Sequence, residues 1–189
     1  MASFGFPETG IGIYPGLGGT QRLPRRVGLP LAKWLVYTGQ SVGAEQALEI
    51  GLCDAVASFE DLDPACEDLA GRGPSGERSA PTAAPAEGWE GLWEFFTENE
   101  VDAILSGEAR PGSDPALEKA VKRMRAKSAN ALFQVERLFD EGAGLGLEEA
   151  LALELRDLDE VFAHPDALEG LSALIEGRRP DFKETAKAP

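Results

Sequence analysis

The stretch from residue 4 to residue 22, FGFPETGIGIYPGLGGTQR, constrains the fold of this chain more than any other segment. Glycine occupies positions 5, 10, 12, 16, 18 and 19, and proline occupies positions 7 and 15. These residues interrupt regular helices and strands, and glycine also lets one backbone lie directly against another. We therefore expect irregular, partly extended chain over residues 4–14, close to another part of the molecule, and then a turn that starts a helix.

The rest of the first 56 residues predicts short apolar elements. Apolar side chains recur there at helical spacing, and Gly39 and Gly51 are suited to ending helices. Pro24 is expected to keep its helix short or to lie in the first turn of that helix. The expected elements are helices over residues 21–27, 31–37 and 44–50 and a short strand over residues 52–56.

The middle of the chain differs in composition from both ends. Residues 57–72 predict one acidic helix, and residues 71–88, GRGPSGERSAPTAAPAEG, indicate a mobile linker with almost no large apolar side chain. Aromatic residues then cluster in a short helical element over residues 89–110. We interpret this aromatic cluster as local core rather than as a platform for a ligand.

The C-terminal part, residues 114–176, is expected to be helical. Asp114 is suited to capping a helix that begins with Pro115, and Gly142 is suited to ending the next one. A third helix would span residues 147–162 and a fourth residues 166–176. The sequence thus predicts a mostly α fold with a short β or extended N-terminal part. It divides into residues 1–56, 57–113 with the linker, and 114–189.

Charge and composition exclude several classes of function. The chain has 18 basic and 33 acidic residues, and its formal net charge of −15 repels nucleic acid and anionic membrane surfaces. Cys53 and Cys66 fit no zinc or disulfide spacing, and His164 as the one histidine leaves no histidine-rich metal site or Ser-His-Asp triad. No apolar run approaches the roughly 20 residues of a membrane span, and no secretory signal is evident. We expect a cytoplasmic protein without a metal, in which His164 has a capping or surface role.

The glycine-rich stretch matches neither common phosphate-binding motif. The spacing of Gly10, Gly12 and Gly16 differs from G-x-G-x-x-G, and no Gly-Lys-Ser/Thr follows Gly18 and Gly19. What remains is Glu8, a carboxyl among proline, glycine and apolar residues. Burial there would raise its pKa and suit it to donating or shuttling a proton near neutral pH. A glutamate on a solvated loop is the alternative, and the residues alone leave both open.

Two blocks carry a family resemblance: FGFPE at residues 4–8 and PGLGGTQR at residues 15–22. Shorter matches follow at TG (38–39), AEQA (44–47), GL (51–52), DAV (54–56), DALEG (166–170) and RPDFK (179–183). In these blocks the chain resembles the enoyl-CoA hydratase/isomerase (crotonase) superfamily. The pattern is most similar to the crotonase module that is fused to a 3-hydroxyacyl-CoA dehydrogenase in multifunctional fatty-acid oxidation proteins. Residues 57–113 depart from simple hydratases and look like an insertion.

The resemblance implies a reaction and a set of site residues. Family members polarise the thioester carbonyl of an acyl-CoA with two backbone N–H groups while glutamates move protons. They hydrate trans-2-enoyl-CoA or shift a double bond in β-oxidation. By this resemblance Glu8 is catalytic, Gly16 helps to hold the water, and Phe182 and Lys183 approach CoA. No cofactor is implied beyond the CoA of the substrate, and NAD only if a dehydrogenase domain is fused. The implied partners are copies of the chain, as a trimer or dimer of trimers, or a missing N-terminal half.

The resemblance also implies an incomplete module. In the family, the loop with the oxyanion N–H donors and the first glutamate precede the block that here begins at Phe4. We therefore expect the C-terminal half of a crotonase-like (ClpP/crotonase) α/β fold with an incomplete core. Losing even one oxyanion donor costs ~10²–10³-fold in rate, so the chain alone is expected to be inactive. The alternative is a non-catalytic helical remnant for oligomerisation or partner binding, which leaves open whether the chain is an enzyme.

Overall fold

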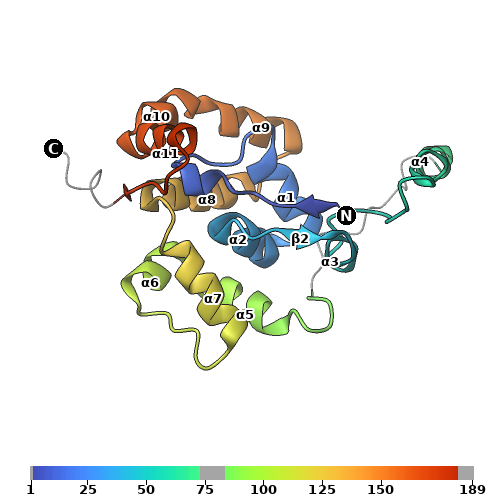
Figure 1. Ribbon diagram of the computed structural model, residues 1–189, viewed down its shortest axis with the longest axis horizontal. Coiled ribbons are helices and arrows are strands. Elements are labelled where there is room, and N and C mark those ends of the chain that lie inside the picture. The colour runs from blue at the N-terminus through green and yellow to red at the C-terminus, as the bar shows by residue number, and fades with distance from the viewer. Residues whose placement is uncertain (1, 73–83, 183–189) are drawn as a thin grey trace.

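The computed structural model describes residues 2–72 and 84–182, which form a mostly helical fold (Figure 1). Most of the expected linker, residues 73–83, and Lys183 lie outside the described residues. In Figure 1, one group of helices runs through the middle of the molecule, with a second group above it and a third below it. The middle group consists of α1 (Gly19–Val27), α2 (Leu29–Thr38) and α8 (Ala129–Gly142).

The N-terminal part confirms the expected irregular chain and corrects one expected strand. Strand β1 (Ser3–Phe4) pairs antiparallel with β2 (Val42–Gly43), and a 3₁₀ turn, η1 (Glu8–Ile11), follows. The strand expected over residues 52–56 was wrong: after α3 (Ala44–Glu49), the N–H groups of Leu52 and Cys53 both donate to the carbonyl of Ala47. The segment therefore folds back onto the end of α3 instead of pairing with a strand.

Helix α1 is nine residues long and contains Pro24 in its interior, so of the two expected alternatives the short helix holds and the first-turn position does not. Proline removes one helical hydrogen bond and clashes with the preceding turn, so such a helix needs support from packing. That support comes from buried side chains of α1, which include Leu23 and Val27. Helix α2 is buried along almost its whole length, as its run of apolar residues requires of a central helix.

The lower group contains the expected insert, and its aromatic residues are core. It consists of α5 (Glu90–Glu98), α6 (Val101–Ser106) and α7 (Pro115–Met124). The ring of Trp89 packs edge-on against Trp34 of α2, with 5.2 Å between ring centroids, and Phe96 packs against Tyr37. The interpretation of the aromatic cluster as local core is therefore confirmed for Trp89 and Phe96. Asp114 caps α7 as expected, accepting from the N–H groups of Ala116 and Leu117.

The upper group consists of α9 (Leu147–Arg156), α10 (Leu158–Ala163) and α11 (Pro165–Glu176). The single helix expected over residues 147–162 was wrong, because the chain breaks at Asp157, whose carboxylate pairs with Arg137 and Arg156. The side chain of His164 caps α11 by accepting from the N–H of Asp166, which confirms its expected capping role. No helix within the described ranges has both the length and the apolar character needed to cross a bilayer.

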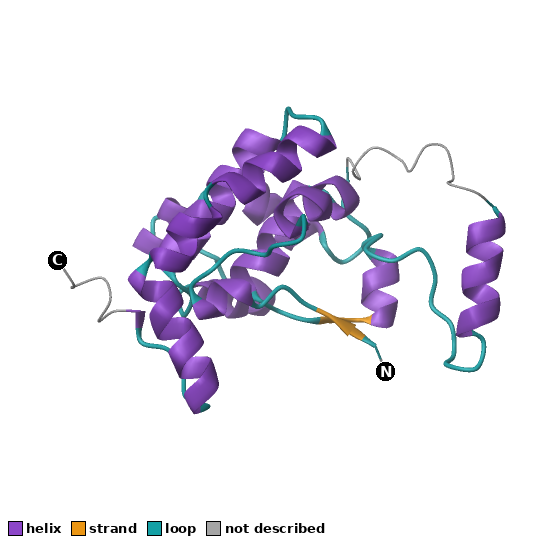
Figure 2. Ribbon diagram, turned by 90° about the horizontal axis from the view of Figure 1, so that it is seen from above, coloured by secondary structure: helices purple, strands orange, loops and turns teal. Residues whose placement is uncertain are grey.

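Helix α4 (Leu62–Gly71) confirms the acidic helix expected near the middle of the chain, but it has no buried residue. Figures 1 and 2 both show it standing apart from the other helices.

Candidate functional site

Glu8 is the first residue of η1, and the neighbouring residues fix this turn from two sides. The hydroxyl of the buried Thr9 donates to the carbonyl of Val36 in α2 at 2.9 Å. The backbone N–H of Ser128, which caps α8, donates to the carbonyl of Thr9 at 3.1 Å. These two hydrogen bonds of Thr9 tie the turn that carries Glu8 to α2 and α8.

Helix α11 lies directly against the other side of η1. A Cβ atom at Gly12, where φ is +79°, would overlap the backbone of Asp166. A Cβ atom at Gly170 would overlap the backbone of Ile11. The two backbones are therefore in contact at both glycines, which confirms the expected close approach of residues 4–14 to another part of the molecule.

The Glu8 carboxyl is half-buried, so the structure does not place it on a solvated loop. Its Oε2 atom is buried and has no hydrogen-bond partner within the described part of the chain. Burial raises the pKa of Glu8 above its ordinary value, and a hydrogen bond with its own backbone N–H acts weakly in the opposite direction. Burial penalises the charged form of a carboxyl, so this one takes up a proton more readily than a solvated glutamate does.

The loop that carries Gly16 is attached to α9 by a residue that sequence reasoning missed. The carboxylate of Glu154 is buried, and it accepts from the N–H of Gly18 at 2.7 Å and from the hydroxyl of Thr20 at 2.5 Å. The hydroxyl of Tyr14 donates to the Glu154 carbonyl at 2.6 Å. Both ends of the loop are therefore held by one residue. The one signal in the sequence was a glutamate within the apolar pattern of residues 147–162.

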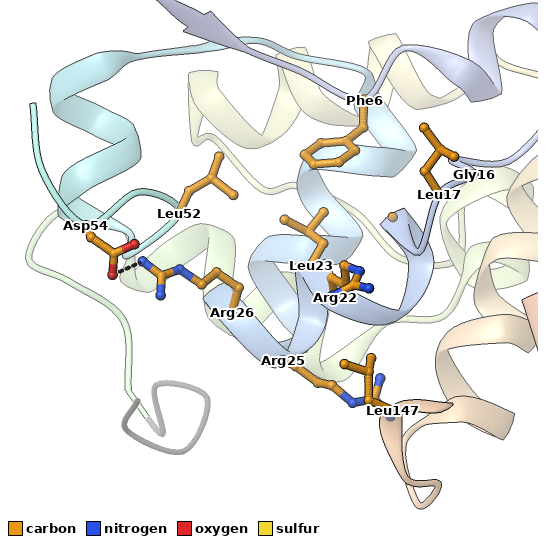
Figure 3. Close-up of a pocket in the computed structure, with 11 residues that line it drawn as sticks. Phe6, Gly16, Leu17, Arg22, Leu23, Arg25, Arg26, Leu52, Asp54 and Leu147 are labelled. Carbon is orange, nitrogen blue, oxygen red and sulfur yellow. Dashed lines mark ion pairs between the residues drawn. The ribbon is translucent and has the colours of Figure 1, made fainter. Parts of the chain in front are cut away.

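Gly16 lines a cleft of about 660 Å³ (Figure 3). Its wall combines apolar side chains with arginines from α1 and the ion pair of Arg26 with Asp54. Next to Gly16, Leu17 has a φ of +57° and a fully exposed side chain. The apolar residues lining the cleft are Phe6, Leu17, Leu23, Leu52 and Leu147, and its other arginines are Arg22 and Arg25.

Phe182 lines a different cleft of about 830 Å³, between the start of α8 and the end of the described chain. Arg125, Lys127 and Arg179 also line this cleft. Burial and the nearby Arg123 lower the pKa of Lys127 below its ordinary value. The two clefts therefore separate Gly16 from Phe182, and Glu8 lines neither of them. The described residues do not bring the expected site residues into one pocket.

The structure shows no candidate metal site in the ranges that it describes. Residues 2–72 and 84–182 contain no group of three or more His, Cys, Asp or Glu side chains arranged to hold a metal ion.

The family model for enoyl-CoA hydratase/isomerase matches residues 1–187 of this chain. A crotonyl-CoA hydratase of Syntrophomonas wolfei is 43% identical over 108 residues, which cover 57% of this chain and 40% of that protein. A fatty acid oxidation complex subunit alpha of Pseudomonas paraeruginosa is 36% identical over 134 residues, which cover 68% of this chain and 18% of that protein.

Solved structures show the same fold. An enoyl-CoA hydratase from Rhodobacter sphaeroides superposes with a TM-score of 0.70 at 27% identity, covering 99% of this chain and 57% of that one. A carnitinyl-CoA dehydratase from Mycobacterium thermoresistibile gives a TM-score of 0.75 at 23% identity, which shows the fold alone. The chain thus spans about half the length of these two solved structures, and 40% or less of the two curated relatives.

Proposed function

The chain belongs to the enoyl-CoA hydratase/isomerase family, and from this premise we propose that it supplies the proton-transferring part of an enzyme acting on acyl-CoA thioesters. The observation that carries the proposal is the Glu8 carboxyl, which is half-buried and has one oxygen without a partner among the described residues. Burial raises the pKa of this carboxyl above its ordinary value. Glu8 would deliver a proton to the carbon beside the thioester during hydration, or move one during double-bond isomerisation.

The cleft beside Gly16 supports an acyl-CoA substrate. Its apolar wall suits an acyl chain, and its arginines suit the phosphates of CoA, because guanidinium groups bind phosphate through paired hydrogen bonds. We assign Gly16 to the water or substrate side of the reaction, and Phe182 with Lys183 to the CoA side. Lys183 lies outside the described residues. The proposed chemistry needs no cofactor beyond the CoA of the substrate.

We predict that the isolated chain does not hydrate crotonyl-CoA. The family resemblance implies that the oxyanion donors and the first glutamate precede the FGFPE block, and the chain spans about half the length of an enoyl-CoA hydratase of known structure. Catalysis is expected when the chain is mixed with the N-terminal part of a full-length relative that carries those groups. The measurement is loss of crotonyl-CoA absorbance for each part and for the mixture. If the chain alone hydrates crotonyl-CoA, it does not need a second part for catalysis, and this prediction is wrong. If the two parts assemble but remain inactive, the proposal that the chain acts on acyl-CoA thioesters is wrong.

A second function, self-association, is favoured by exposed apolar side chains on the upper helices. The exposed fractions are 63% for Leu155 of α9, 63% for Leu174 of α11 and 86% for Ile175 of α11. Exposed apolar side chains of this size are suited to packing against a second copy of the chain. This surface would serve oligomerisation whether or not the chain takes part in catalysis.

Leu155→Asp is expected to weaken self-association at least tenfold while leaving the unfolding midpoint within a few degrees. The side chain is mostly exposed, so the new charge meets a partner surface rather than the core. Sedimentation equilibrium gives the association constant, and Ala116→Asp, at an exposed position of α7, is the matched control. Leu151 is unsuitable because it packs against Gly18. If Leu155→Asp and Ala116→Asp weaken association equally, or if neither does, the surface around Leu155 is not the site of self-association.

A further inference from the structure

Lys127 differs from the other lysines of the described ranges because it lines a cleft and its ammonium has no acceptor there. It lies just before Ser128, the cap of α8, and it lines the same cleft of about 830 Å³ as Phe182. The side chain is half-buried, and no hydrogen bond or ion pair of its ammonium occurs within the described part of the chain. A partly buried cation without a partner costs free energy, which makes it a candidate for a functional group.

The other lysines of the described ranges have different surroundings. Lys33 of α2 is only 3% exposed, and its ammonium lies 3.0 Å from Oε2 of Glu100. Lys119 and Lys122 are exposed on α7, and they line neither of the two clefts. Lys127 is therefore the one lysine in these ranges that combines a place in a cleft with an unpaired ammonium.

The ammonium of Lys127 lies against backbone rather than against a carboxylate. A Cβ atom added to Gly10 would lie 3.0 Å from its Nζ atom, and one added to Gly39 would lie 2.8 Å from it. Gly10 belongs to η1 and Gly39 ends α2, so the amine lies between the turn that carries Glu8 and the end of α2. Burial, followed by the nearby Arg123, lowers the pKa of the amine below its ordinary value. The neutral amine, which is the nucleophilic form, is therefore more abundant at a given pH.

The cleft is suited to attracting an anion. Three cations line it, and they outnumber the two carboxyls of its wall. The cations are those of Arg125, Lys127 and Arg179, and the carboxyls are those of Asp166 and Asp181. In a chain with a formal net charge of −15, this local excess of positive charge favours a ligand that carries phosphate. Arg179 is exposed, and a guanidinium binds phosphate through paired hydrogen bonds.

We propose that Lys127 is an acylation site, at which the amine takes the acyl group from an acyl thioester of CoA. The nitrogen attacks the carbonyl carbon of the thioester, the C–N bond of an amide forms, and the C–S bond breaks. The proton that the nitrogen gives up goes to the departing sulfur, so the products are an Nε-acyl-lysine and the free thiol of CoA. The step needs no other reactant, and it removes the positive charge between η1 and the end of α2.

This proposal rests on the proposed function only for the identity of the acyl donor. Glu8 takes no part in the step, and it does not line the cleft of Lys127. Acylation can therefore be measured on the isolated chain, whether or not that chain catalyses hydration.

The test is incubation of the intact, purified chain with acetyl-CoA, followed by peptide mass spectrometry of its lysines. Acetylation of Lys127 is expected to exceed that of Lys119 and Lys122 at least about tenfold, the lower end of the concentrating effect of a charged cleft. S-acetyl-N-acetylcysteamine has the same thioester but no phosphate, so with this donor the preference for Lys127 is expected to shrink at least about threefold.

Three variants separate the amine from the charge of the cleft. Lys127→Arg keeps the charge but has no amine to acylate, so acetylation is expected to vanish at this position alone. Arg179→Gln keeps the amine but removes a cation of the cleft, so the preference with acetyl-CoA is expected to fall at least about threefold. Arg110→Gln is the matched control, since Arg110 is exposed and lines neither cleft, and it is expected to change nothing.

Two results would overturn the acylation site. One is acetylation of Lys127 that does not exceed that of Lys119 and Lys122. The other is a preference that neither Arg179→Gln nor the phosphate-free thioester reduces. The hydration assay of the assembled enzyme tests the proposed function separately: hydration without acetylation of Lys127 refutes the acylation site alone, and acetylation in an assembly that does not hydrate refutes the proposed function alone.

Discussion

Gly12→Ala is expected to destabilise the fold by about 2–6 kcal/mol, enough to unfold a marginally stable chain. Two costs combine at this position. A side chain at φ +79° is strained by about 1–3 kcal/mol, and its Cβ would overlap the backbone of Asp166, an overpacking that costs about 1–3 kcal/mol. Neither neighbour can move easily, because both atoms belong to backbone.

Alanine variants at three other glycines measure the cost of the positive φ and the cost of the backbone overlap separately. Gly170→Ala introduces only the overlap, with Ile11, and Gly112→Ala introduces only a positive φ, of +63°, with open space around it. Gly144→Ala introduces neither and serves as the control. Urea unfolding of the four variants should rank Gly12 as most destabilised and Gly144 as unchanged. A Gly12 variant as stable as the Gly144 variant would mean that η1 and α11 are not in backbone contact.

Glu8→Gln is expected to lower kcat of the assembled enzyme by about 10²–10⁴-fold, because an amide keeps the size of the side chain but transfers no proton. KM should change little, since glutamine occupies the same volume as glutamate and leaves the shape of the site unchanged. The measurement is steady-state hydration of crotonyl-CoA by the mixture of this chain with the N-terminal part of a relative.

A control variant and the pH dependence of kcat test whether the loss of activity comes from the Glu8 carboxyl itself. Glu149→Gln, an exposed change in α9, should leave kcat unchanged. Because burial raises the pKa of Glu8, the ionisation that controls kcat should lie above 4.5 in the unmodified enzyme and be absent from the glutamine variant. If Glu8→Gln kept full activity, another group would have to move the proton, and the proposed role would fail.

Local chemistry predicted much of the fold. The glycine pattern correctly predicted a close backbone approach, and Asp114 with Pro115 correctly predicted a capped helix start. The strand at residues 52–56 failed because strand-forming residues still need a partner, and the Ala47 carbonyl takes both N–H groups instead. The helix breaks at Asp157, whose carboxylate pairs with Arg137, twenty residues earlier in the chain.

Less of the candidate site than of the fold could be predicted from the sequence. The apolar neighbours of Glu8 left a buried and a solvated carboxyl both open, and the structure has it half-buried. The role of Glu154 depends on Gly18 and Thr20, more than 130 residues away in the chain, and Glu136 accepts from the N–H of Val101, which is 35 residues away. Such pairs become visible only after the helices have packed, because no local pattern distinguishes a buried glutamate from a solvated one.

Helix α4 has a consequence for how the molecule melts. A ten-residue helix without buried side chains gains almost nothing from tertiary packing, and helices of this length are marginal in water by themselves. It therefore contributes little to the cooperative transition of the remaining helices. Calorimetry on this chain would record the enthalpy of the packed body alone, and the arm formed by α4 would fray well before that body melts.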